Sequence, residues 1–336
     1  MRRLTATFLI VAALLTISNS TLAQGQSPEP LGMTGRIELP ESGFAWSVPD
    51  GMTAYTIDGG YGSSPPRELD YAWQRLTLAL ATTQLEGLGT VLAFESGSWC
   101  AASATDLFAG SDPLEDIEAH LSLAQSVSNL TGPTEINLHG GDAQVLSWKV
   151  ANPLGLTLKH TAYAISEGSR AGIVWCASED PDVEWLEAAR AFEFVPMPVT
   201  YGTPTYRLRI VWPVGWAAWV AATGEDDWYL VAAFSGEESC AVVDEVSVPW
   251  AGATIDTVRE SALVEGKERL ERVAIAIVGP EAGVGAAARF DSDVESVYLF
   301  ASDDALISLS CDTTAVVPPE DRWLSIARTF EFLPEE

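Results

Sequence analysis

Basic residues are scarce in this chain of 336 residues. Lysine occurs three times, and lysine and arginine together number 18 against 47 aspartates and glutamates, which gives a formal net charge of −29. A surface this acidic repels phosphate backbones and anionic lipid headgroups. The acids stand singly and in pairs rather than in one tail, a pattern typical of a solvated surface. The composition therefore argues against a nucleic-acid partner and against membrane attachment through a basic patch.

Long apolar runs are absent as well. The run within residues 8–17 is about ten residues long, whereas a helix that spans a bilayer needs roughly twenty. It follows two arginines and precedes Thr21-Leu22-Ala23, so residues 1–23 have the three parts of a secretory signal peptide. We expect cleavage near Ala23, a flexible leader at 24–35, and a mature chain without a membrane span that is secreted, periplasmic or at the cell surface. Retention of the segment as an N-terminal anchor is the alternative.

Motifs for metal, cofactor and nucleophilic chemistry are missing too. None of the three histidines (His120, His139 and His160) falls in HExxH or a comparable spacing, and no CxxC occurs. Ser96-Gly97-Ser98 is a small-residue turn rather than a Gly-x-Ser-x-Gly elbow. The glycines at 283–288 resemble a dinucleotide loop but precede a predicted strand. We therefore expect no cofactor, no metal site and no catalytic residues, although the many acids leave room for a glycosidase-type carboxylate pair.

Two halves of the chain end in nearly the same segment. WLEAARAFEFVP occupies residues 185–196 and WLSIARTFEFLP residues 323–334, with eight of twelve positions identical. Upstream, an alternating segment ends in Pro-x-Gly in each half, at 43–52 and 206–216. These matches predict a tandem duplication with a period of about 140–165 residues, which is the size of a domain. The duplication argues for an architecture repeated twice rather than for a chemistry.

The matches also place the boundaries of the two copies. We expect the first copy at 36–197, a short stiff linker rich in proline and glycine at 198–204, and the second copy at 205–336. The first copy carries an additional segment at 65–87 that we interpret as a helix packed on the sheet. Its apolar residues at helical spacing are Leu69, Trp73, Leu76 and Leu80.

Cysteine is limited to four residues, and each copy holds one pair at matching places: Cys100 with Cys176, and Cys240 with Cys311. An even number of cysteines in an exported protein indicates disulfides. Four cysteines allow three connectivities, of which the duplication favours one disulfide within each copy. Redox chemistry or metal binding is the alternative, which the missing CxxC disfavours. Loops of this length predict a stabilisation of at most roughly 4–5 kcal/mol per disulfide.

Each copy is expected to contain an antiparallel sheet covered by helices. Asp112-Pro113-Leu114-Glu115 has the order of a capping box and starts a helix predicted to run to Leu130. Closing helices are predicted from Asp180 in the first copy and around Trp323 in the second, because apolar residues recur at offsets 0, +3, +4 and +7. A less regular helix is predicted within 255–273. Short turns between alternating segments predict antiparallel hairpins, so the expected fold class is α+β: two tandem α/β/α sandwiches.

This order of elements resembles the Mog1/PsbP-like domain. The residues that carry the resemblance are RIVWPVGW (209–216) and WLSIARTFEF (323–332), with counterparts SVPDGM (47–52) and WLEAARAFEF (185–194) in the first half. The paired cysteines depart from that pattern. The resemblance implies noncatalytic roles, which in that family include photosystem assembly, Ran binding and exported bacterial proteins. No residue here favours the photosystem or the Ran role.

Tryptophan is abundant, and five of the twelve cluster in the second copy: Trp212, Trp216, Trp219, Trp228 and Trp250. Exposed tryptophans would form a platform for sugars or peptides, but Trp212 and Trp216 flank the Pro-x-Gly turn and are expected in the core. The function that we expect is noncatalytic binding or assembly outside the cytoplasm, with a protein or small-molecule partner. The alternatives are an extracytoplasmic hydrolase with a site between the two copies, and a purely structural envelope protein.

Overall fold

The structure, a computed structural model, describes residues 32–57, 90–95, 97–107, 112–123, 127–138, 141–151, 157–203, 206–220, 230–246, 287–291, 295–301, 306–315 and 320–334. Strand accounts for 64% and helix for 13% of these residues. Every strand pair among them is antiparallel.

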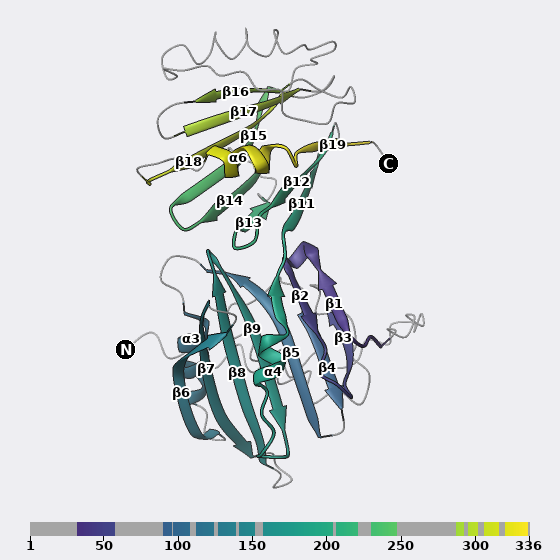
Figure 1. The fold of residues 1–336 in the computed structure, drawn as a ribbon, viewed down its shortest axis with the longest axis vertical. Coiled ribbons are helices and arrows are strands. Elements are labelled where there is room, and N and C mark those ends of the chain that lie inside the picture. Colours follow the sequence, from purple (N-terminus) through teal and green to yellow (C-terminus); the bar gives the residue numbers. More distant parts are fainter. Residues whose placement is uncertain are drawn as a thin grey trace, which may run out of the picture. The chain divides into compact units, whose positions relative to one another are not determined.

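A seven-stranded sheet is the largest element of the fold (Figure 1). Its strands, in spatial order, are β3 (Thr53–Ile57), β4 (Thr90–Glu95), β5 (Ser98–Asp106), β9 (Arg170–Ser178), β8 (Thr157–Glu167), β7 (Gly141–Ala151) and β6 (Val127–Leu138). β8 and β9 pair as an antiparallel hairpin, as the short turns in the sequence predict. Their turn lies at Gly168, whose φ of 59° is left-handed. All residues of β9 are buried, as expected of a central strand covered on both faces.

One face of this sheet packs against a small three-stranded sheet, in which β2 (Phe44–Ser47) lies between β1 (Arg36–Leu39) and β10 (Phe192–Phe194). A short 3-10 helix, η1 (Pro40–Ser42), joins β1 to β2. Phe44 and Phe192 stack with ring centroids 5.2 Å apart. Gly172 of β9 has no room for a side chain, because a Cβ there would lie 2.1 Å from the Phe192 ring. The helix α4 (Leu186–Arg190) borders the same core, where the Ala188 carbonyl accepts a hydrogen bond of 2.9 Å from the Trp46 indole.

The opposite face carries helix α3 (Pro113–Ser122), which contacts β6, β7 and β8 (Figure 1). Leu114 and Ile117 of α3 are buried against this face. A cluster of aromatic rings lies in the same core, formed by Trp99, Trp148, His160 and Trp175. The seven-stranded sheet is therefore buried by a small sheet on one side and by a single described helix on the other.

The second half of the chain repeats the combination of a large and a small sheet. Its six-stranded sheet has the order β13 (Ala217–Val220), β14 (Val231–Ser235), β15 (Glu238–Val246), β18 (Leu306–Thr313), β17 (Glu295–Ala301) and β16 (Ala287–Asp291). Its three-stranded sheet has β12 (Arg207–Trp212) between β11 (Met197–Gly202) and β19 (Glu331–Leu333). Helix α6 (Glu320–Ala327) contributes Trp323 and Ile326 to the core between them. The Trp323 indole donates to Glu238 of β15 at 3.1 Å, which fixes the helix to the sheet.

Two disulfides join neighbouring strands of the large sheets. Cys100 of β5 bonds to Cys176 of β9, and Cys240 of β15 bonds to Cys311 of β18. In both cases the two cysteines are direct partners across the strand pair, with Cα atoms 4.0 and 4.1 Å apart. The described residues contain no free cysteine. The predicted pairing is confirmed.

The predicted fold class is wrong. The described residues form mostly antiparallel β structure rather than an α+β fold of two α/β/α sandwiches with helices covering the sheets. The reason is visible at residues 44–46 and 192–194, whose large apolar side chains cover the seven-stranded sheet from strands. Phe192, which belongs to the apolar stripe that predicted a closing helix, thus fills the core from a strand of the second sheet.

Several predicted helices differ from the structure in their bounds. The helix expected from Asp112 to Leu130 ends at Ser122, and Val127 already begins β6. The closing helix expected from Asp180 begins at Leu186, because the Asp180 side chain instead accepts the Asp182 N–H at 2.9 Å in a local turn. The chain continues from the two closing helices into the short strands β10 and β19. The helices expected within 65–87 and 255–273, and the segment 1–23, lie outside the described residues.

Most of the segment predicted as a linker, 198–204, belongs to a strand. Residues 197–202 form β11, which pairs with β12 from Met197 to Gly202. Extended residues such as Val199 and Thr200 pair here with Ile210 and Arg209 of β12, the central strand of the three-stranded sheet. The described part of the leader, residues 32–35, includes Met33, which bridges to Ala54 of β3.

Candidate functional site

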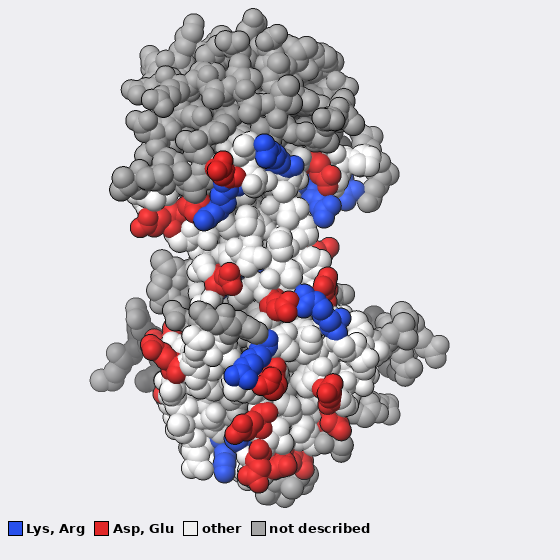
Figure 2. Space-filling view, viewed as in Figure 1, with Lys and Arg blue, Asp and Glu red and all other residues white. Residues whose placement is uncertain are grey.

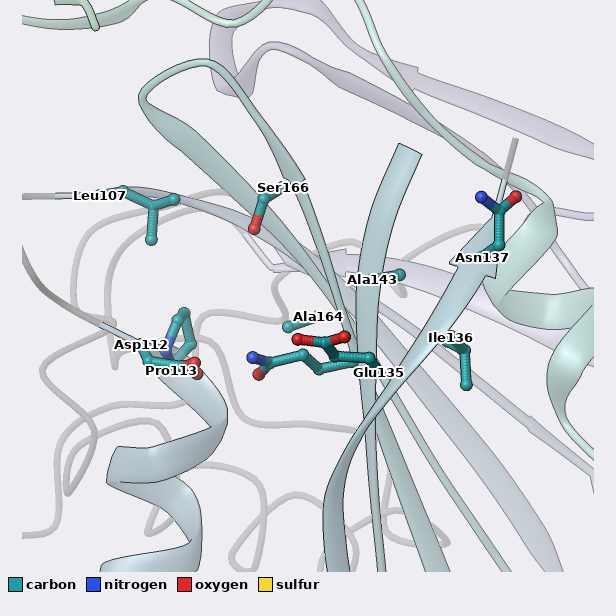
Figure 3. A pocket seen from close by; sticks show the side chains of 10 residues that line it. Leu107, Asp112, Pro113, Glu135, Ile136, Asn137, Ala143, Ala164 and Ser166 are labelled. Atoms are coloured by element: carbon teal, nitrogen blue, oxygen red, sulfur yellow. The ribbon is translucent and has the colours of Figure 1, made fainter. Parts of the chain in front are cut away.

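A polar cavity lies over strands β6, β7 and β8, beside the start of α3 (Figure 3). Strand register determines which side chains meet there. Glu135 of β6 is the direct partner of Gln144 of β7, and Gln144 is the direct partner of Ala164 of β8. Because direct partners in an antiparallel pair lie on the same face, these three residues form one row across the sheet.

The cavity has a volume of about 650 Å³. It is lined by Leu107, Asp112, Pro113, Glu135, Ile136, Asn137, Ala143, Gln144, Ala164 and Ser166. Figure 3 shows Glu135 directed to the side on which Asp112 and Pro113 begin α3, with Leu107 and Ser166 along another side. Ala164 of β8 is 4% exposed and carries only a methyl group, so the row of side chains leaves open space beside Gln144. A larger residue at this position would fill part of the cavity.

Hydrogen-bond acceptors dominate the cavity. Asp112 is the N-cap of α3: its Oδ1 accepts the N–H groups of Leu114 at 2.9 Å and Glu115 at 3.3 Å. Gln144 Oε1 is shielded from solvent and has no hydrogen-bond partner among the described residues. None of the ten lining residues is lysine, arginine or histidine. The cavity can therefore accept hydrogen bonds from a ligand, but it offers no cationic group to an anion.

A second cavity, of about 630 Å³, borders a buried ion pair. Arg170 is 1% exposed; its Nε lies 3.3 Å from Asp106 Oδ1, and its Nη2 donates to the Ser42 carbonyl at 2.8 Å. Burial raises the pKa of Asp106, while Arg170 acts to lower it. Burial likewise lowers the pKa of Arg170, against the effect of Asp106. Because these two charges face each other and hold η1 to β9, we assign them a structural role.

The residues that the sequence singled out do not meet in either cavity. His160 lies within β8 as expected, but it is buried; its ring stacks on Trp148 with centroids 5.2 Å apart, and its Nδ1 accepts the Trp175 indole N–H at 3.2 Å. His120 lies in α3, and His139 lies outside the described residues. Among the residues with described side chains, no group of three or more His, Cys, Asp or Glu could hold a metal ion.

The tryptophans of the second half divide between core and surface. Trp212 and Trp216 are 0% and 1% exposed and stack with centroids 5.6 Å apart, which confirms their place in the core. Trp219 of β13 is partly exposed and packs edge-on against Phe234. Trp228 and Trp250 lie outside the described residues. The described tryptophans therefore form no continuous exposed platform.

Sequence reasoning missed the cavity over β6–β8. Its principal polar residues, Glu135, Gln144 and Ser166, lie on three different strands, and only the register brings them to one place. The available signal was the alternation of Glu135 and Asn137, polar residues two apart in what proves to be strand β6.

As for membrane insertion, none of the described helices has the length and apolar character of a transmembrane helix.

Comparison with known proteins yields only weak similarities. No protein-family model matches the chain, and no curated protein matches it. The solution structure of cyanobacterial PsbP (CyanoP) from Synechocystis is 13% identical, with a TM-score of 0.29 over 52% of this chain and 97% of that chain. A crystal structure of a protein from Bacteroides thetaiotaomicron is 10% identical, with a TM-score of 0.29 over 82% of this chain and 89% of that chain.

Proposed function

We propose that this chain is a noncatalytic binding protein that acts outside the cytoplasm. The observation that carries the proposal is the cavity over β6–β8, which is large enough for a small ligand and is lined by convergent polar groups (Figure 3). Its lining holds no histidine, cysteine or lysine, the residues that most often serve as base or activated nucleophile. This composition favours recognition of a ligand over its chemical conversion.

The location rests on the disulfides and on the N-terminal segment. Disulfides form and persist in oxidising compartments, and two are present. In this proposal residues 1–23 are a signal peptide that is cleaved near Ala23, and residues 24–35 are a leader before the first strand. The mature protein would then be secreted, periplasmic or displayed at the cell surface. Its excess of carboxylates, spread over the surface in Figure 2, is consistent with a solvated exported protein.

The proposal includes a tandem duplication of one PsbP-like domain, at 36–197 and 205–336. The strand orders support it: β3-β4-β5-β9-β8-β7 in the first half corresponds to β13-β14-β15-β18-β17-β16 in the second. The small sheets β1-β2-β10 and β11-β12-β19 correspond in the same way, and each disulfide joins the third strand of the large sheet to the fourth. Such agreement in strand order supports the proposed duplication beyond the matching sequence segments.

Binding without turnover can be tested directly. The purified, unreduced protein would be equilibrated with a panel of small polar metabolites, and each compound would be recovered and identified by mass spectrometry. We expect retention of at least one compound in unchanged form, and loss of retention in Ser166→Leu, which places bulk at the exposed rim of the cavity. Ser325→Leu, a matched change at an exposed serine of α6, should retain the compound. Chemical conversion of a bound compound would instead favour a hydrolase.

A further inference from the structure

The lining of the cavity over β6–β8 restricts the chemistry of its ligand. Asp112 and Glu135 contribute carboxylates, while the amide of Gln144 contributes a carbonyl oxygen. Ionised carboxylates only accept hydrogen bonds. Asp112 already accepts two backbone N–H groups of α3, but with no lysine, arginine or histidine in the lining no side chain there compensates the charge of Glu135. A ligand that enters must supply donors, and a positive charge on it would be favoured.

Gln144 provides the second, independent indication. Its Oε1 is shielded from solvent without a donor among the described residues. A buried acceptor that lacks a donor is unfavourable, because it has lost its hydrogen bonds to water without replacing them. Its partner across the strand pair is Glu135, which in the ionised form has no donor to offer. A donor from a ligand would remove this penalty.

Two other kinds of cation fit less well. Quaternary ammonium groups carry no N–H and are held by aromatic cages, yet none of the ten lining residues is aromatic. Divalent metal ions need several convergent ligands, and the residues with described side chains include no group of three His, Cys, Asp or Glu that could hold one. A primary ammonium or guanidinium group has both the charge and several N–H donors.

We propose that this cavity binds a small organic cation that bears N–H donors, namely a primary amine or a guanidinium compound. The proposal rests on the binding function proposed above and names the class of ligand. Glu135 supplies the countercharge, and Gln144 Oε1 accepts an N–H from the bound cation. The net charge of −29 raises the local concentration of any cation and assists its association. The same group could also be presented as an arginine side chain of a partner protein.

Isothermal titration calorimetry of the full mature protein at 0.15 M salt tests the proposal. The probes are agmatine as the free guanidinium and amine compound, an end-blocked Gly-Arg-Gly peptide as the side chain of a partner, tetramethylammonium as a cation without N–H donors, and glucose as a neutral polyol. We expect saturable one-site binding of agmatine or of the peptide, and no binding of tetramethylammonium. Tighter binding of agmatine than of the peptide would mean that the guanidinium group belongs to a free small molecule. Tighter binding of the peptide would mean that it belongs to an arginine side chain of a partner protein.

Variants locate the binding to the cavity. Glu135→Gln and Gln144→Leu should each weaken the binding of the guanidinium probe about tenfold, as expected for the loss of one charge-assisted hydrogen bond. Glu179→Gln removes an equal charge at an exposed position outside the cavity and should change the affinity less than twofold. Far-UV circular dichroism and the melting temperature of each variant confirm that it is folded.

Three outcomes would overturn the proposal. Equal binding of agmatine and tetramethylammonium, or equal effects of Glu179→Gln and Glu135→Gln, would mean attraction to the charged surface alone. Binding of glucose but not of either guanidinium probe, lost in Ser166→Leu, would refute the ligand class while the binding function stands. Failure of every probe here, together with no retained compound in the metabolite panel, would refute both.

Discussion

At the scale of single residues, Gly43 is restricted both by its backbone conformation and by a buried neighbouring side chain. Its φ is 65°, and a Cβ there would lie 1.9 Å from Nη1 of the buried Arg170. A side chain would displace the guanidinium from the Ser42 carbonyl, to which it donates at 2.8 Å. Gly43 therefore combines a left-handed conformation with a steric requirement.

We expect Gly43→Ala to lower the free energy of unfolding by at least about 2 kcal/mol, because backbone strain adds to the displacement of Arg170. Gly35→Ala is the matched control: Gly35 also has a positive φ, 80°, but no atom lies within 4 Å of its Cβ position. That variant should lose only about 1 kcal/mol. Urea unfolding followed by tryptophan fluorescence measures both, and equal losses would contradict the steric role of Arg170.

The ion pair of Asp106 and Arg170 predicts a pH dependence of stability. Burial raises the pKa of Asp106 above its ordinary value of 3.8. Between pH 3.8 and this raised pKa, the folded state therefore holds a proton that the unfolded state has released. The contribution of Asp106 to the free energy of unfolding should therefore be highest below pH 3.8. It should fall as the pH rises through the pKa of Asp106 in the folded state. Above that pKa, the ionised carboxylate remains buried at a net cost.

Asp106→Asn removes this titration. We expect the difference in free energy of unfolding between this variant and the wild type to be constant at low pH and to change as the pH rises through the pKa of Asp106 in the folded state, because only the wild type titrates there. Arg170→Met should lower stability at pH 7 by about 3–5 kcal/mol, because it leaves a buried carboxylate without its cation. Urea titrations between pH 3 and 7 measure both curves. A stability difference between wild type and Asp106→Asn that does not change with pH would contradict the assignment.

At the scale of elements, the start of α3 depends on one side chain. Asp112 Oδ1 accepts two backbone N–H groups, those of Leu114 and Glu115. We expect Asp112→Ala to lower the free energy of unfolding by about 1 kcal/mol. Asp112→Asn should lower it by much less, because asparagine is an equally good N-cap. Asp180→Ala, which removes a single turn hydrogen bond, should cost less. Thermal unfolding of the three variants compares them, and an Asn variant as unstable as the Ala variant would argue against capping.

Local signals predicted the elements better than their extent. The capping residue Asp112 marked the beginning of α3 correctly, because capping is decided within three residues. Its end was missed, because Val127 continues a helical spacing and yet pairs with Val150 as the start of β6. In the same way, Trp185 and Phe192 belong to the predicted apolar stripe and are buried, but Trp185 precedes α4 and Phe192 begins β10. Hydrophobic spacing thus located the core, while pairing with distant strands decided the conformation.

Pairing over long distances also explains why the candidate site escaped prediction. The cysteines could be paired from the repeat alone, because each pair occupies matching places in the two halves. The cavity depends instead on the register of Glu135 with Gln144 and of Gln144 with Ala164. A shift of one residue would turn each strand's side chains to the other face. No local pattern specifies that register, so the site appears only in the folded structure.

At the scale of the whole molecule, residues 33–336 form one compact unit although the strand order repeats. The tip of the β8–β9 hairpin contacts the second half: the Ser169 N–H donates to the Gly215 carbonyl at 2.8 Å, and the Gly236 N–H donates to Ser169 Oγ at 3.0 Å. A Cβ on Gly168 would lie 2.4 Å from the Gly215 oxygen. These contacts couple the two halves through backbone atoms and the hydroxyl group of Ser169.

We therefore expect the two halves to unfold in a single cooperative transition, and Gly168→Ala to lower its midpoint. The variant combines strain at a φ of 59° with a clash against Gly215, for a loss of about 2 kcal/mol or more. Gly236→Ala has a similar φ of 61° but no atom within 4 Å of its Cβ position, so it should lose about 1 kcal/mol. Differential scanning calorimetry distinguishes the outcomes. Two separate transitions, of which Gly168→Ala moves only one, would mean that these contacts do not couple the halves.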